Sequence, residues 1–84
     1  MFLTSKTPKL DLHGEITSMV PVLVDGFINE NYLLKNNLVR IIHGKSTNVL
    51  TKEVHRVLKK NRLVLEYKLN AWNLGETIVI IKSR

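Results

Sequence analysis

The 84-residue chain contains no cysteine. Structural disulfides, thiolate zinc sites and cysteine nucleophiles are therefore excluded. Acidic residues are also scarce, because seven Asp and Glu stand against thirteen Lys and Arg and leave a net charge of +6 with neutral histidines. A basic surface steers polyanions toward a protein. We therefore expect nucleic acid or the ribosome as a partner, the alternative being a basic surface with no partner.

Long apolar runs are absent as well. No segment approaches the roughly 20 residues that a membrane-spanning helix needs, and the apolar stretch that opens the sequence is too short for a secretory signal. We expect a cytoplasmic protein without membrane contact. With 44% hydrophobic residues, the chain suffices for one compact domain. We assign residues 1–8 to an N-terminal tail and residues 9–84 to that domain.

The spacing of apolar residues predicts six elements in the order βαβαββ. Alternation of apolar and polar residues indicates strands, and apolar residues three or four positions apart indicate helices. Thr17 or Ser18 is expected to cap the first helix, with Pro21 in its first turn. The expected elements are strand 9–13, a helix ending near residue 34, strand 36–43, a helix from 47 or 48 to 61, and strands 63–69 and 76–83.

These elements predict a two-layer α+β sandwich. A strand, a helix and a second strand normally form a right-handed parallel unit. The last two strands are joined by the short segment NAWNLG, as in a hairpin. We therefore expect a mixed four-stranded sheet with both helices on one face.

Two predicted strands end in a histidine followed by a glycine, within DLHG (residues 11–14) and IIHGKST (residues 41–47). Binding sites in open α/β sheets lie beyond the carboxyl ends of parallel strands, so we expect these two turns to approach one another. The N–H groups at a helix N-terminus suit a phosphate oxygen. The second turn lacks the upstream glycine of a Walker A loop, which argues against a nucleotide-hydrolysing P-loop.

These two motifs resemble those of the small MutS-related (Smr) domain family, in the same order and separation. The resemblance covers about residues 9–82, nearly the whole chain. It implies a βαβαββ fold like the C-terminal domain of bacterial translation initiation factor three. It also implies nucleic-acid binding, with nicking of DNA or cleavage of RNA by several members. By position, the family's functional residues fall on Asp11, Leu12, His13, Gly14, His43, Gly44, Lys45 and Ser46.

The catalytic candidates are Asp11, His13 and His43. A neutral imidazole can take a proton from a ribose 2′-hydroxyl, and its conjugate acid can protonate a leaving oxygen. Asp11 could orient an imidazole, act as a general base or hold a divalent ion. Its structural alternative is a salt bridge to Arg40, and that of His43 is a hydrogen-bonded role at the end of its strand. We predict no tight metal site and no certain cofactor, with weakly bound Mg²⁺ or Mn²⁺ as the exception.

The phosphate-binding candidates lie in the two turns and along the second helix. Lys52, His55, Arg56 and Lys59 recur at three- and four-residue steps, which places them on the helix's solvent face. They form either a phosphate-binding track or an ordinary solvated surface. The full set of binding candidates is Gly14, Gly44, Lys45, Ser46, Thr47, Lys52, Arg56 and Lys59. In this set Ser46 stands where family members commonly carry a glycine.

Three functions remain open from the sequence. The first is an endonuclease of DNA or RNA, and the second is a non-catalytic module that binds structured nucleic acid or the ribosome. The third is a protein-interaction domain that uses the open sheet face, which leaves the paired histidine turns unexplained. Trp72, the sole tryptophan, stands in the final loop, where it either stacks on an unpaired base or caps one end of the core.

Overall fold

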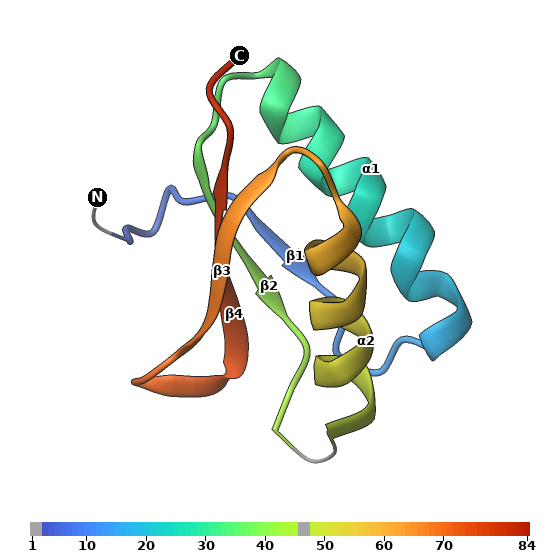
Figure 1. Ribbon diagram of the computed structural model, residues 1–84. Coiled ribbons are helices and arrows are strands. Elements are labelled where there is room, and N and C mark those ends of the chain that lie inside the picture. Colours follow the sequence, from blue (N-terminus) through green and yellow to red (C-terminus); the bar gives the residue numbers. More distant parts are fainter. Residues whose placement is uncertain (1–2, 46–47) are drawn as a thin grey trace.

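The computed structural model describes residues 3–45 and 48–84 (Figure 1), and in these ranges four strands form one mixed sheet. The sheet order is β1-β2-β4-β3, with β1 parallel to β2 and the other neighbours antiparallel. This confirms the predicted mixed sheet. In chain order the elements are β1 (Lys9–Asp11), α1 (Val20–Leu33), β2 (Leu38–Ile42), α2 (Asn48–Lys60), β3 (Val64–Asn70) and β4 (Asn73–Ile81).

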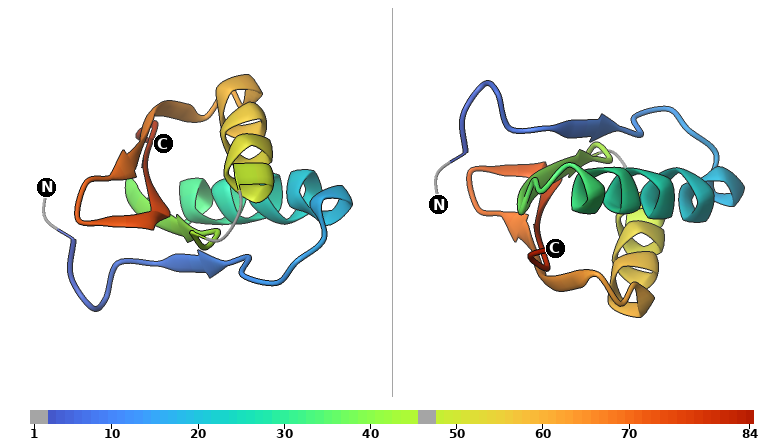
Figure 2. Two further views of the ribbon diagram at one scale, coloured as in Figure 1. Left: turned by 90° about the horizontal axis from the view of Figure 1, so that it is seen from below. Right: turned by 90° about the horizontal axis from the view of Figure 1, so that it is seen from above.

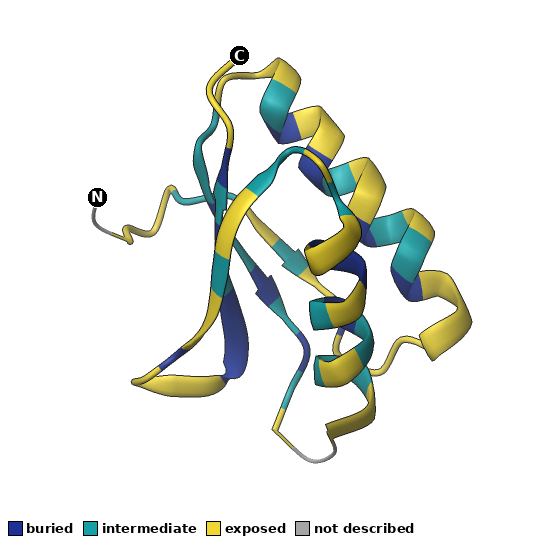
Figure 3. Cartoon of the chain, in the orientation of Figure 1, coloured by how far each residue is buried: buried dark blue, intermediate teal, exposed yellow. Residues whose placement is uncertain are grey.

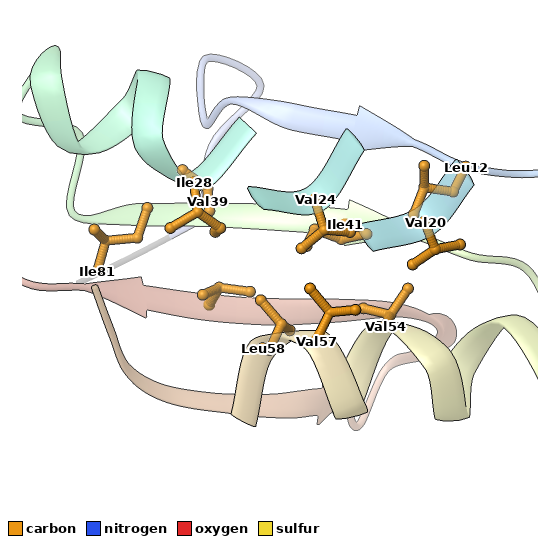
Figure 4. Packing of buried hydrophobic residues seen from close by; sticks show 11 residues of the cluster. Leu12, Val20, Val24, Ile28, Val39, Ile41, Val54, Val57, Leu58 and Ile81 are labelled. Atoms are coloured by element: carbon orange, nitrogen blue, oxygen red, sulfur yellow. The ribbon is translucent and has the colours of Figure 1, made fainter. Parts of the chain in front are cut away.

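Both helices lie on the same face of the sheet, as predicted (Figure 2). The core between the layers follows from the period of each element. In β2, Val39 and Ile41 are buried toward the helices, whereas Arg40 and Ile42 are half-buried on the opposite face. Figure 4 shows the packed cluster, which comprises Leu12, Val20, Val24, Ile28, Val39, Ile41, Val54, Val57, Leu58, Val79 and Ile81. Within the described residues, no helix is long and apolar enough to cross a membrane.

The start of α1 differs from the sequence prediction. Thr17 and Ser18 lie in a short 3₁₀ helix (Thr17–Met19), and the residue that precedes α1 is Met19, without a side-chain cap. The 3₁₀ turn leads the backbone directly into α1, so no hydroxyl is needed there. Pro21 stands in the first turn of α1, as predicted, where the missing N–H costs no helical hydrogen bond.

Several strand boundaries also differ by one to three residues. The first strand ends at Asp11, two residues before the predicted end. The last strand starts at Asn73 rather than at residue 76, because Asn70 of β3 pairs directly with Asn73. The predicted NAWNLG loop is therefore mostly strand, and only Ala71 and Trp72 form the turn of the hairpin.

Candidate functional site

The buried side chain of Leu12 and two backbone hydrogen bonds hold the first histidine turn in place. Leu12 is buried, and its N–H donates to the carbonyl of Ile42 at 2.7 Å. The N–H of Glu15 donates to the carbonyl of Leu12 at 2.8 Å, which closes a β-turn with Gly14 at φ +81° in its third position. That conformation favours glycine, as in type II turns.

The carboxylate of Asp11 holds the backbone of this turn. Asp11 Oδ1 accepts a hydrogen bond from the N–H of His13 at 2.9 Å, and both side chains are exposed. The structural alternative for Asp11 was a salt bridge to Arg40. Arg40 instead pairs with Glu76 at 3.3 Å. Asp11 therefore positions the backbone of His13 and leaves the imidazole in solvent.

The second histidine occupies a different environment. His43 is only 3% exposed, and both of its ring nitrogens have partners. Nε2 lies 2.8 Å from the hydroxyl of Thr77, and Nδ1 lies 2.8 Å from the hydroxyl of Thr51 and 3.1 Å from the carbonyl oxygen of Gly44. This geometry fits the structural alternative for His43 better than direct proton transfer with a ligand.

A second contact of Thr77 extends this set of hydrogen bonds to His55. The Thr77 hydroxyl also lies 2.8 Å from Nε2 of His55. Because the Gly44 carbonyl can only accept, we assign the proton to Nδ1 of His43, so that Nε2 of His43 accepts from Thr77. Thr77 then accepts from the Nε2–H of His55. The result is one chain of hydrogen bonds, His55 to Thr77 to His43 to Gly44.

This chain of hydrogen bonds orients the loop that follows β2. The Gly44 carbonyl points toward the His43 ring, and in a trans peptide the following N–H points the opposite way. The N–H of Lys45 is therefore directed away from the buried histidine. The Lys45 side chain is exposed, so its ammonium is accessible to a ligand. This is a suitable arrangement for a phosphate oxygen.

The two histidine turns meet, as predicted. A side-chain carbon built on Gly44 would lie 3.7 Å from Cδ2 of His13, and Gly44 itself has φ +84°. However, the N–H of Gly44 is not available to a ligand, because it donates to the carbonyl of Gly75 at 3.0 Å. The N–H of His43 donates to the same oxygen at 2.9 Å. Gly44 therefore contributes the path of the backbone and its contact with His13, and its own N–H is not a donor for a ligand.

Gly75 was not expected at the site, and it allows β4 to pass under the loop. A side-chain carbon on Gly75 would lie 3.2 Å from Cγ of Lys45 and 3.3 Å from the carbonyl carbon of Gly44. Both distances are tighter than ordinary van der Waals contact. The aliphatic part of Lys45 thus rests on Gly75.

Not all basic side chains of the track expected on α2 are free of a partner within the protein. Lys52, Arg56 and Lys59 are exposed, but Arg56 forms a two-bond ion pair with Glu53 at 2.6 and 2.7 Å. That guanidinium lowers the pKa of the Glu53 carboxyl below its ordinary value. The placement of His55 on the solvent face is wrong, because its ring is half-buried and packs against Tyr67 with centroids 5.0 Å apart.

Three further expectations concern residues near the loop. Ser46 and Thr47 lie outside the described residues. In the ranges that the structure describes, no three His, Asp or Glu side chains gather closely enough to hold a metal ion. The core-capping alternative for Trp72 is wrong, because this side chain is 96% exposed.

The sequence analysis did not identify four residues that contact the two turns or the hairpin beside them: Thr51, Thr77, Gly75 and Glu76. For one of them, the sequence pattern indicates a buried position. Thr77 alternates in phase with Val79 and Ile81, which places a polar group on the inward face of β4. A buried hydroxyl there needs a partner. The identity of that partner depends on how β4 pairs with β2, which no local pattern specifies.

The half-buried His55 makes the stability of the domain depend on pH. Burial lowers the pKa of His55 below its ordinary value of 6.5, and the neighbouring His43 lowers it further. The unfolded chain therefore takes up the proton first. We expect the free energy of unfolding to be highest above about pH 6.5 and to fall as the pH drops toward the lowered pKa. Urea titrations between pH 5 and 7.5 would measure this slope.

The control variant is His55→Gln, whose amide can still donate to Thr77 but does not titrate. Its stability should depend less steeply on pH over the same range. Equal slopes for the variant and the parent would contradict the assignment of this pH dependence to His55.

The fold, the two meeting turns and the sequence together define the class of this domain. The Smr domain family matches residues 10–82, so the chain belongs to the Smr domain family.

In sequence, the chain is similar to proteins named Endonuclease MutS2. The chain is 34% identical over 79 residues to Endonuclease MutS2 of Agathobacter rectalis and 38% identical over 80 residues to that of Halothermothrix orenii. These matches cover 94% and 92% of this chain but 10% of each relative. The chain therefore spans about a tenth of the length of these relatives.

Two crystal structures have the same fold. The Smr domain of Thermus thermophilus MutS2 superposes with a TM-score of 0.86 at 23% identity, over 90% of this chain and 99% of that chain. YdaL, a stand-alone small MutS-related protein from Escherichia coli, gives 0.85 at 23% identity, over 94% of this chain and 70% of that chain.

Proposed function

We propose that this Smr domain acts in the cytoplasm as an endonuclease that cleaves RNA or nicks DNA. The observation that carries the proposal is the exposed imidazole of His13 beside Gly44, next to the exposed ammonium of Lys45. A general base and a phosphate-binding cation thus lie at one place. The names of the MutS2 relatives and the net charge of +6 support the same function.

In the proposed reaction on RNA, His13 takes the proton of a ribose 2′-hydroxyl. The 2′-oxygen attacks phosphorus, the bond from phosphorus to the 5′-oxygen breaks, and that oxygen takes a proton from water. The products are a cyclic 2′,3′-phosphate and a free 5′-hydroxyl. On DNA, which lacks the 2′-hydroxyl, His13 would take a proton from an attacking water. The water oxygen would bond to phosphorus, one phosphodiester bond to a sugar oxygen would break, and that oxygen would take a proton from water. Lys45 would stabilise the charge that develops on the phosphate oxygens in both cases.

Asp11 has two proposed roles at this site. In the first, Asp11 Oδ1 accepts from the N–H of His13 and fixes the turn that carries the proposed general base. Asp11 is also the only carboxylate in the two motifs, so a weakly bound Mg²⁺ or Mn²⁺ would be held near it.

The second candidate function is a binding module without catalysis. The burial of His43 favours it, because His13 is left as the only exposed imidazole among the two turns. A paired acid and base made of two histidines is therefore not formed at this surface. Nucleic acid or ribosomal RNA would then bind at Lys45 and along α2 without being cut.

A cleavage assay separates the two functions. Labelled single-stranded RNA, duplex DNA and branched DNA are incubated with the purified protein, with Mg²⁺, with Mn²⁺ and with a chelator. Endonuclease activity predicts products in at least one condition, and a cyclic phosphate end identifies the RNA route. If every substrate is bound but none is cut, the binding module replaces the endonuclease.

Binding should depend steeply on salt. If Lys45, Lys52 and Lys59, with or without the paired Arg56, touch about three or four phosphates, the log–log slope of affinity against salt is roughly −2 to −4. Lys52→Glu together with Lys59→Glu should weaken binding and flatten the slope, as measured by fluorescence anisotropy. These exposed changes should cost only about half a kcal/mol of stability each.

Lys82→Glu is the matched control for this prediction. Lys82 is exposed and follows β4, at the end of that strand opposite to Gly75. It changes the net charge in the same sense at a distance from the loop. Lys82→Glu reverses one charge where the helix variant reverses two, so a loss of binding free energy half that of the double variant would show that net charge, and not the track on α2, governs binding.

A further inference from the structure

The sole tryptophan is displayed at the tip of the β3–β4 hairpin without contact to the core. Trp72 is 96% exposed, and Leu74, two residues further on, is 57% exposed. Figure 1 shows this turn at the same end of the molecule as the end of β2 and the start of α2. In Figure 3 the exposed turn and the exposed first residues of β4 adjoin the buried stretch of that strand, which begins at Gly75. A large aromatic side chain in this position offers its whole ring to a partner.

The turn is held in place by side chains, so the position of Trp72 is defined. Asn70 Oδ1 accepts from the N–H of Trp72 at 2.9 Å, and Asn73 Oδ1 accepts from the N–H of Gly75 at 3.1 Å. Asn70 Nδ2 donates to the carboxylate of Glu76 at 3.2 Å, and Asn73 Nδ2 donates to it at 3.4 Å.

The carboxylate behind the turn is itself anchored to the centre of the sheet. Glu76 is 4% exposed, and its other oxygen pairs with Arg40 of β2 at 3.3 Å. The charge of Glu76 is thus balanced by Arg40 and by two amide donors. A buried, paired network of this kind rigidifies its surroundings. It therefore holds the hairpin turn in place, although the ring of Trp72 is almost fully exposed.

The same hairpin is bonded to the loop that follows β2. The Gly75 carbonyl accepts from both His43 and Gly44, and Gly75 lies three residues from Trp72 along β4. At about 3.3 Å per residue, Trp72 and Gly75 are about 10 Å apart. A hollow of about 220 Å³ separates the hairpin from the start of α2, and it is lined by Gly44, Lys45, Asn48, Thr51, Leu69 and Leu74.

We propose that Trp72 stacks on an unpaired base of the strand whose phosphate is held at Lys45, so that the domain selects single-stranded or unpaired segments. The inference rests on the nucleic-acid binding proposed above and adds the substrate class. Bases inside a duplex stack on each other, whereas an unpaired base has a free face for an aromatic ring. Stacking of this kind tolerates any base. The cationic surroundings, with Lys45 beside the hollow and a net charge of +6, favour a polyanion over an uncharged peptide.

The experiment uses Trp72 as its own reporter, because the emission of the sole tryptophan comes from this residue alone. The protein is titrated with a single-stranded oligonucleotide, a blunt duplex of the same length and an abasic strand that keeps the phosphates but lacks bases. Fluorescence anisotropy of labelled strands gives the affinities in parallel. We expect the single strand with bases to quench the emission at saturation, and the abasic strand and the duplex to leave it nearly unchanged.

Three variants complete the test. Trp72→Ala should weaken binding of the single strand about 10-fold or more, with little change for the abasic strand, whereas Trp72→Phe should keep most of the affinity. Leu65→Ala is the matched control, since Leu65 is an exposed apolar residue of β3 away from the turn. All three should melt close to the parent.

The outcomes separate this inference from the proposed function. If Trp72→Ala binds single strands as tightly as the parent, stacking is wrong while nucleic-acid binding stands. Equal quenching by the abasic strand would also overturn stacking, because it would place Trp72 against the backbone. If the parent binds none of the three strands, the proposed function fails and the stacking with it.

Discussion

His13→Ala should reduce the rate of strand cleavage about 100-fold or more and leave the fold intact. The imidazole of His13 is exposed and is the only one at the two turns that can reach a ligand, so its removal takes away the general base. The turn itself rests on Asp11, Leu12 and the backbone, which the substitution leaves unchanged. Initial rates on the best substrate and the melting temperature of each protein would test this.

Glu15→Ala is the matched control for His13→Ala, because Glu15 is an exposed residue of the same turn. It should cleave close to the parental rate. Affinity for the uncut strand should be nearly unchanged by His13→Ala, since Lys45 remains. If His13→Ala cuts as fast as the parent, the endonuclease mechanism proposed for His13 fails, and the binding module becomes the better function for the domain.

His43→Ala should act mainly on stability. It removes a buried ring and leaves the hydroxyl of Thr51 and the Gly44 carbonyl without this partner, while Thr77 keeps only its contact with His55. The cavity and the unpaired groups together should cost about 2–4 kcal/mol of the free energy of unfolding. For a domain of this size that corresponds to a fall in melting temperature of roughly 10 °C or more. Chemical denaturation monitored by circular dichroism would measure the loss.

The control for His43→Ala is His43→Gln, whose amide can replace part of the hydrogen bonding. It should recover some of the stability. At a temperature where both variants are folded, weaker binding of nucleic acid is also expected, because the peptide between Gly44 and Lys45 is no longer fixed. A His43→Ala protein as stable as the parent would show that the chain of hydrogen bonds contributes little.

The two histidines show what the sequence could and could not predict. Both end a strand predicted from the sequence and both precede a glycine, so the motifs alone predict the same role for each. The fold separates them, because β1 is at the edge of the sheet and β2 is in its interior. His13 follows a three-residue edge strand and stays in solvent, whereas His43 lies under α2 and beside β4. The meeting of the two turns was predictable from parallel pairing, but the burial of His43 depends on how β4 pairs with β2.

The order and the layers of the fold were predictable for a similar reason. The apolar period of each element is local, and the handedness of the βαβ unit is general. The exact turn of the β3–β4 hairpin was not, because the polar residues of NAWNLG resemble a loop. Their side chains instead bind Glu76, a partner whose buried position is specified by Arg40 on another strand.

The shortness of β1 has a consequence for how the site holds together. This strand has three residues and pairs with β2 alone, and Leu12 is its one fully buried anchor in the core. Segments with few buried contacts open at a lower free energy than the whole domain. Detachment of β1 would separate His13 from Gly44, whereas His43 and Thr77 contact each other in the interior of the sheet. The proposed general base is thus expected to lie in a part of the domain that opens at a lower free energy than the part that carries Lys45. A bound nucleic-acid strand that contacts both His13 and Lys45 would therefore hold β1 against the sheet.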